Sequence, residues 1–276
     1  MKFQFNGILL ELDLREVLYD MKKLFLLVLF LLISQIMNSQ NRTLLWADEF
    51  DGKTLDSKSW NYEKGTGKNY EEQYYTSRNK NIRIEEGLLV IEARKEDYKG
   101  SEYTSARINT FKKQHFKYGR IEIRAKLPKG NGTWPAIWML GENRVRDGYP
   151  ACGEIDIMEH VGKSPSEIHG AIHFPEIDNK ELVSSSRMFA LPLSSDTFHT
   201  YAIEWDENSI NYFIDDLPFY HFSLKDAERE GRENIFQKPF YLIINLALGG
   251  NWAGEIDDSI FPARFYIDYV RYYDLK

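Results

Sequence analysis

The stretch "RIEIRAKL" at residues 120–127 decides the fold class, because charged and apolar side chains alternate through all of it. Side chains of a strand point alternately to opposite faces, so this pattern predicts an antiparallel strand with one buried face. Similar short runs lie at residues 88–93, 136–140, 167–174, 200–205, 210–214, 240–248 and 265–273. Turn-forming residues separate them, and the best helical candidate, 224–233, is so polar that we expect a surface loop or short helix. The chain is therefore predicted to be an all-β sandwich or barrel.

The first 40 residues are predicted to lie outside this domain. From Met21 the sequence has two lysines, an unbroken apolar run at 24–33 and then polar residues, which is the layout of a secretory signal peptide. The run is shorter than the roughly 18 residues that cross a bilayer, so we expect no stable membrane span. Residues 1–20 are either a mis-assigned upstream start or a long first region of the signal. We expect a secreted protein, extracellular, periplasmic or at the cell surface, with a single domain at 41–276.

Charge and cysteine content narrow the classes of partner. The net charge of −7 makes nucleic acid and anionic membranes poor partners. One cysteine, Cys152, excludes an internal disulfide, and with no Cys-His motif around it we interpret it as a small, semi-buried strand residue. A monomer is the default expectation.

The stretch "GEIDIMEH" at residues 153–160 carries three carboxylates on a predicted strand. Glu154 and Asp156 share one face, but Glu159 lies five positions after Glu154, which would send it to the apolar face at a high cost. A β-bulge at residues 157–158 would return Glu159 to the acidic face. The two glutamates would then approach to about 5 Å, the spacing of the carboxyl pair in retaining glycosidases.

Two other interpretations of these acids were weighed. The first is a solvent-exposed acidic strand, but no lysine or arginine between Asp147 and Lys163 would balance its charge. The second is a metal site of Asp156, Glu159 and His160, but the sequence has neither the HExxH pattern nor a Cys/His pair.

Ten segments in order resemble glycoside hydrolase family 16, especially its laminarinase-like endo-1,3-β-glucanases. They are "LLWADEFDG" (44–52), "NYEEQYYT" (69–76), "NIRIEEGLLVIEAR" (81–94), "TSARI" (104–108), "YGRIEIRAKLPKGNGTWPAIWML" (118–140), "GEIDIMEHVG" (153–162), "HGAIHF" (169–174), "FHTYAIEW" (198–205), "FYLIINLALGGNW" (240–252) and "IDYVRYY" (267–273). The resemblance implies a β-jelly-roll of two curved antiparallel sheets, with the substrate cleft across the concave face. It also implies that Glu154 is the nucleophile, Glu159 the acid/base and Asp156 the carboxylate that supports the nucleophile, in the family's bulged branch.

The resemblance further implies sugar contacts and a metal. The sugar contacts would be Asn69, Arg107, Trp134, Trp138, His173 and Trp252, with His169 structural and with Tyr70 where the family usually has a second asparagine. Flat aromatics with a few polar side chains suit the C–H faces and hydroxyls of sugars. Glu49, the carbonyl of Gly87 and Asp268 match a structural calcium site, whose oxygen ligands are of the right kind. Catalysis itself is expected to need no cofactor.

We therefore expect a secreted retaining endo-β-glucanase that hydrolyses β-1,3-glucan, including mixed-linkage glucan, by double displacement. Three alternatives remain: hydrolysis of an algal galactan such as agar, carrageenan or porphyran, transglycosylation on the same scaffold, and a non-catalytic carbohydrate-binding jelly-roll. Sulfated galactans favour a basic cleft, and Arg107 is the only basic residue that the sequence assigns to it, which favours a neutral glucan.

Overall fold

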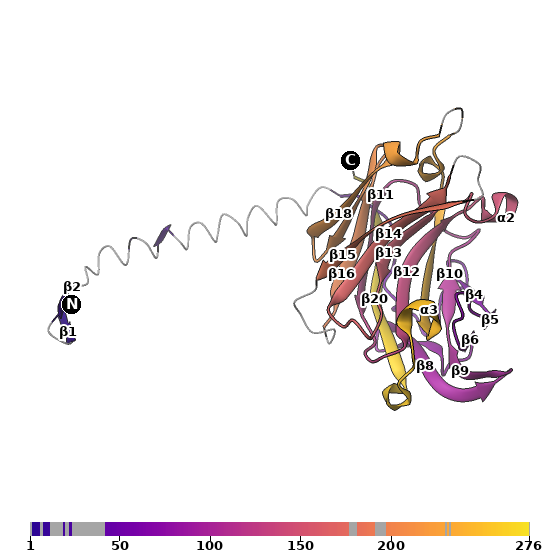
Figure 1. The fold of residues 1–276 in the computed structure, drawn as a ribbon, viewed down its shortest axis with the longest axis horizontal. Coiled ribbons are helices and arrows are strands. Elements are labelled where there is room, and N and C mark those ends of the chain that lie inside the picture. The colour runs from indigo at the N-terminus through magenta and orange to yellow at the C-terminus, as the bar shows by residue number, and fades with distance from the viewer. Residues whose placement is uncertain are drawn as a thin grey trace. The chain divides into compact units, whose positions relative to one another are not determined.

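The computed structural model describes residues 2–5, 8–11, 19, 22–23, 42–176, 181–190, 197–229, 231 and 233–275 (Figure 1). The chain divides into two units, one of Met1–Thr43 with Lys276 and one of Leu44–Leu275. In the first, β1 (Lys2–Phe5) and β2 (Ile8–Glu11) form an antiparallel pair. The apolar run at 24–33 lies outside the described residues. No helix in the described residues has the length and apolar character needed to cross a membrane.

The second unit contains two sheets. In its described residues, one sheet has seven strands, each antiparallel to its neighbours. Their order is β15 (Leu182–Ala190), β14 (Glu167–Pro175), β13 (Glu154–Glu159), β12 (Thr133–Gly141), β19 (Phe240–Leu248), β10 (Arg107–Asn109) and β4 (Asn61–Glu63). The acidic stretch thus forms β13, in the middle of this sheet.

The other sheet has eleven described strands, nine of them in one path. This path runs through β18 (Leu217–Ser223), β17 (Ser209–Ile214), β16 (His199–Trp205), β11 (Gly119–Lys126), β20 (Ala263–Tyr273), β8 (Leu88–Tyr98), β9 (Ser101–Ser105), β6 (Gln73–Tyr75) and β5 (Gly65–Thr66). β3 (Leu44–Asp48) pairs with β20, and β7 (Ile82–Glu85) pairs with β8. β6 and β9 are parallel, and the other pairs are antiparallel.

The core lies between the two sheets. Ile121 and Ile123 of β11 belong to one buried cluster with Ile155 and Ile157 of β13, as the alternating patterns predicted. Arg120 departs from the expected wet charged face, because its side chain is only 1% exposed. It forms ion pairs with Glu122, Glu204 and Asp216, which compensate the buried charge.

The predicted all-β sandwich is confirmed, and each predicted strand is present with modest changes at its ends. β15 and β18 were not predicted, because their alternation is interrupted by polar or exposed residues. Within 224–233, the structure has a short 3-10 helix, η1 (Leu224–Ala227). Cys152 corrects one expectation: it is fully buried in the turn before β13, not semi-buried in a strand.

Candidate active site

The predicted bulge in β13 is present. Between Asp156 and Glu159, β13 advances three residues while each neighbouring strand advances two. Ile157 is the residue without a partner on β12, and Ile157 and Met158 are both buried in the core. The extra residue changes the face to which the following side chains point. Glu159 therefore lies on the same face as Glu154 and Asp156.

A cleft of about 190 Å³ crosses β13, β12, β19 and β10 on this face. It is lined by Lys68, Asn69, Glu71, Arg107, Trp134, Ala136, Trp138, Leu140, Arg144, Tyr149, Glu154, Asp156, Glu159, Asn245 and Ala247. All three predicted acids and four of the six predicted sugar contacts are in this set.

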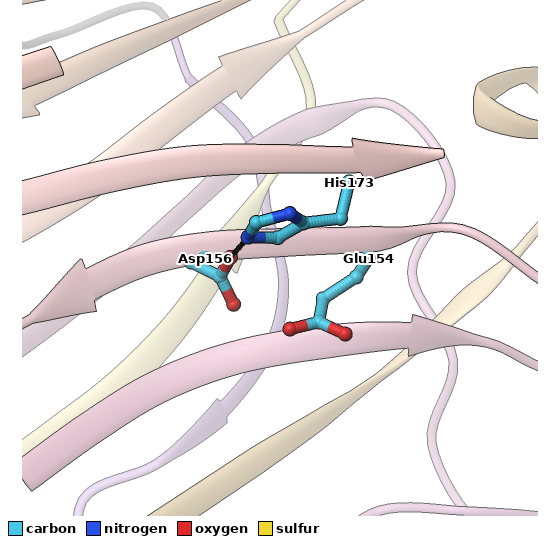
Figure 2. A group of neighbouring side chains, drawn as sticks. All are labelled: Glu154, Asp156 and His173. Atoms are coloured by element: carbon cyan, nitrogen blue, oxygen red, sulfur yellow. Dashed lines mark ion pairs between the residues drawn. The ribbon is translucent and has the colours of Figure 1, made fainter. Parts of the chain in front are cut away.

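His173 on β14 lies beside Glu154 and Asp156 (Figure 2). Its Nε2 lies 3.1 Å from Oδ2 of Asp156, and its Nδ1 lies 2.7 Å from Oγ of Ser184. Ligand atoms of His173, Glu154 and Asp156 lie within 4.8 Å of one another, so these side chains could also hold a cation. The structure thus places His173 against Asp156, and His173 is not among the residues that line the cleft.

Burial raises the pKa of every acid in the trio. The pKa of Glu154 rises to about 8 and that of Glu159 to about 7, first through burial and then through repulsion by neighbouring carboxylates. The pKa of Asp156 is raised well above its usual value, because this side chain is fully buried. The trio cannot be fully ionised at neutral pH. We place a proton on Asp156, the most buried of the three, where it is shared with Glu154 through a hydrogen bond.

Tryptophans form the wall of the cleft at the Glu159 end of β13. Nε1 of Trp134 donates a hydrogen bond of 3.0 Å to Oε1 of Glu159, which favours the ionised carboxylate and opposes the effect of burial on its pKa. Trp252, on α3 (Gly250–Ala253), packs edge-on against Trp134 with ring centroids 5.3 Å apart. His169 packs against Trp252 at 5.0 Å, in agreement with its predicted structural role.

Arg107 lies at the other side of the cleft floor, on β10. Its guanidinium lies 4.7 Å from the ring centroid of Trp138, and its Nε lies 3.0 Å from a carboxylate oxygen of Glu63. Nε1 of Trp138 donates to Oδ1 of Asn245 at 2.8 Å. Trp138 is thereby held between a guanidinium and an amide.

The backbone at Asn69 and Tyr70 adopts the left-handed conformation, with φ of 58° and 61°. Asparagine tolerates this conformation better than tyrosine does. The carbonyl of Asn69 accepts a hydrogen bond of 3.1 Å from the amide of Asn251, which holds this loop against α3. Asn69 therefore lines the cleft beside the tryptophan wall, while Tyr70 is 84% exposed.

Several residues that line the cleft were not predicted from the sequence. Ala136 and Leu140 alternate with the two tryptophans of β12, so the period of two could have found them. Asn245 is a polar residue within the otherwise apolar β19, which was also a readable signal. Lys68, Arg144 and Tyr149 come from loops or from the short helix α2 (Arg144–Asp147), where no local pattern indicates direction.

The predicted calcium ligands lie around the middle of β20. Its register with β3 and β8 brings Glu49 and Gly87 to the two sides of β20, close to Asp268. Oxygen donors on β20 and beside the ends of β3 and β8 fit the chemistry of calcium. Both carboxylates bind arginines in this structure: Glu49 binds Arg271 at 2.8 Å, and Asp268 binds Arg124. A bound calcium would have to replace these two contacts.

Carboxylates of raised pKa among tryptophans in an open cleft are suited to the cleavage of bonds between sugars, and such an enzyme is a glycoside hydrolase. Comparison with known proteins gives the family. The model of "Glycosyl hydrolases family 16" matches residues 69–271, and the chain belongs to that family.

Relatives with names and structures agree with this membership. The chain is 45% identical to a beta-glucanase of Rhodothermus marinus over 83% of this chain and 84% of the relative. It is 36% identical to glucan endo-1,3-beta-glucosidase A1 of Niallia circulans, covering 83% of this chain but 37% of that longer protein. The laminarinase catalytic domain of Thermotoga maritima is 41% identical, with a TM-score of 0.77 over 86% of this chain and 100% of the domain. The predicted laminarinase-like jelly-roll is thus confirmed.

Proposed function

We propose that this protein is a secreted, retaining endo-β-1,3-glucanase. The observation that carries the proposal is the bulge at Ile157, because it gathers Glu154, Asp156 and Glu159 on one face of a cleft. The substrate is inferred from the relatives, which are named for β-glucan, 1,3-β-glucan and laminarin. Trp134 and Trp138 supply the flat apolar surfaces that glucosyl rings require.

The mechanism that we propose has two displacements. Glu154 attacks the anomeric carbon and forms a glycosyl-enzyme bond, while Glu159 gives its proton to the leaving oxygen. Glu159 then removes a proton from water, which attacks the same carbon and releases Glu154. Asp156 holds the shared proton during this cycle, so that Glu154 can carry the negative charge of a nucleophile. His173 positions Asp156 through the 3.1 Å contact between its Nε2 and Oδ2 of Asp156.

We propose that the sugars on either side of the reacting bond are bound by Asn69, Arg107, Trp138 and Trp252.

The proposal also includes two features outside the cleft, export and a structural calcium. Export follows from the signal-like run at 24–33, and mature protein recovered from the medium or periplasm should begin near residue 41. Structural calcium is proposed at Glu49, Gly87 and Asp268, where it would join the first strand of the domain to the last.

The decisive experiment incubates the protein with laminarin, lichenan, agarose and carrageenan and follows reducing ends. We expect release from laminarin, with products that first appear as the β-anomer in a proton NMR time course. An α-anomer as first product would refute the retaining mechanism. Release from agarose or carrageenan alone would indicate a galactan hydrolase. Oligosaccharides longer than the substrate would indicate a transglycosylase, and no release from any of the four would indicate a binding module.

A further inference from the structure

Arg144, at the start of α2, is a cleft-lining arginine whose charge is uncompensated. In the described part of the chain its side chain makes no hydrogen bond or ion pair, and its Nε atom is buried. Burial raises the pKa of the nearby Cys152 and Tyr241, and the positive charge of Arg144 opposes that rise in both. A buried donor without a partner costs free energy, which an acceptor on a bound ligand would recover.

Arg107 provides the contrast inside the same cleft. Its guanidinium is paired with Glu63 and stacked on Trp138, so its charge is already balanced. Arginines elsewhere in the domain, such as Arg78, Arg83, Arg124, Arg264 and Arg271, are paired with carboxylates as well. In a chain with a net charge of −7, acidic partners are plentiful, and among the residues that the structure describes Arg144 still lacks one. A balanced arginine suits neutral hydroxyls, whereas an unbalanced one suits an anion.

A second uncompensated cation faces the cleft from its other end. Arg144 lies beyond Leu140, the end of β12 that pairs with Glu154. Lys68 lies toward the Trp134 end of β12, next to the loop that is bonded to α3. Among the described residues its ammonium group also makes no hydrogen bond or ion pair. A polysaccharide in the cleft would therefore meet one free cation at each wall.

We propose that the cleft accepts a β-glucan that bears anionic substituents, carboxylate or sulfate, and that Arg144 is the residue that recognises the anion. This inference rests on the proposed function and specifies its substrate class. It also revises the expectation of a neutral glucan, which depended on Arg107 being the only basic residue in the cleft. A guanidinium can bind either oxyanion through two parallel hydrogen bonds, so the two substituents share one recognition chemistry.

The test compares one glucan backbone with and without charge. Substrates are laminarin, lightly carboxymethylated laminarin and lightly sulfated laminarin, at 20 mM and 500 mM NaCl, where the substrate charges are weakly and strongly screened. The wild-type enzyme is expected to have a kcat/KM about tenfold higher on an anionic laminarin than on the neutral one at low salt, because one charge-assisted contact is added. The separate carboxymethyl and sulfate arms show which oxyanion is preferred.

Matched variants assign the effect. Arg144→Gln should reduce the ratio of anionic to neutral kcat/KM to about one. Arg144→Lys should give a ratio between those of the wild type and Arg144→Gln, because lysine keeps the positive charge but cannot form the two parallel hydrogen bonds of a guanidinium. Arg107→Gln, at the paired arginine, should lower kcat/KM on both substrates by the same factor and leave the ratio intact. Equal kcat/KM of the wild type on both substrates, or a ratio that Arg144→Gln does not change, would overturn the proposal.

A binding readout separates this proposal from the proposed function. Failure of the wild type to release reducing ends from any laminarin would refute the glucanase assignment. Native gels that contain anionic or neutral laminarin then still decide the role of Arg144. Stronger retardation by the anionic polymer, lost in Arg144→Gln, would support anion recognition, and equal retardation by both polymers would refute it.

Discussion

Replacing Trp134 by phenylalanine should move the alkaline limb of the pH profile to higher pH. The indole Nε1 donates a hydrogen bond of 3.0 Å to Glu159, and this bond stabilises the ionised carboxylate. Its loss should raise the pKa of Glu159 above about 7. A hydrogen bond to a charged group contributes roughly 1.5–3 kcal/mol, which corresponds to about one to two pH units. Water enters the open cleft and replaces part of the bond, so we expect about one pH unit.

The assay is kcat/KM on laminarin between pH 4 and pH 10. Because the proposed general acid must be protonated, a higher pKa lets it work at higher pH, and the upper limb should move upward. Trp138→Phe is the matched control, since it removes an indole from the same cleft whose Nε1 bonds a neutral amide on Asn245. An upper limb that stays in place in Trp134→Phe, moves to lower pH, or moves equally in Trp138→Phe would refute the reasoning.

Three further predictions concern the acids, the calcium and a tight turn. Glu154→Ser and Glu159→Gln should each lower kcat by about 10³-fold or more with an unchanged circular dichroism spectrum, and near-normal turnover in either would contradict the mechanism. EDTA should lower the Tm of the wild type by about 5 °C and leave Asp268→Asn unaffected, whereas an equal response of both would argue against the metal. Gly162→Ala would put its Cβ 1.8 Å from the carbonyl oxygen of Gly130. It should cost about 2 kcal/mol or more in free energy of unfolding, and a wild-type midpoint in urea would show that the turn can relax.

Much of the active site could be predicted because its signals are local. The strand period of two made Glu159 an anomaly, and a bulge was the simplest device that kept its carboxylate out of the core. The structure has this bulge at Ile157. The same period on β12 identifies a face with Trp134 and Trp138, both of which line the cleft.

The sequence by itself determined the strands that alternate regularly or form apolar runs, the acidic face and the bulge, since each depends on residues within one strand. Only the tertiary structure decided which loops meet that face, because the positions of Lys68 and Arg144 depend on strand pairings distant in sequence. It also decided where charge is tolerated: Arg120 can be buried because Glu204 and Asp216, 84 and 96 positions away, come within reach of its guanidinium. The protonation of the trio follows from burial as well, and burial belongs to the packed sheets and not to a local pattern.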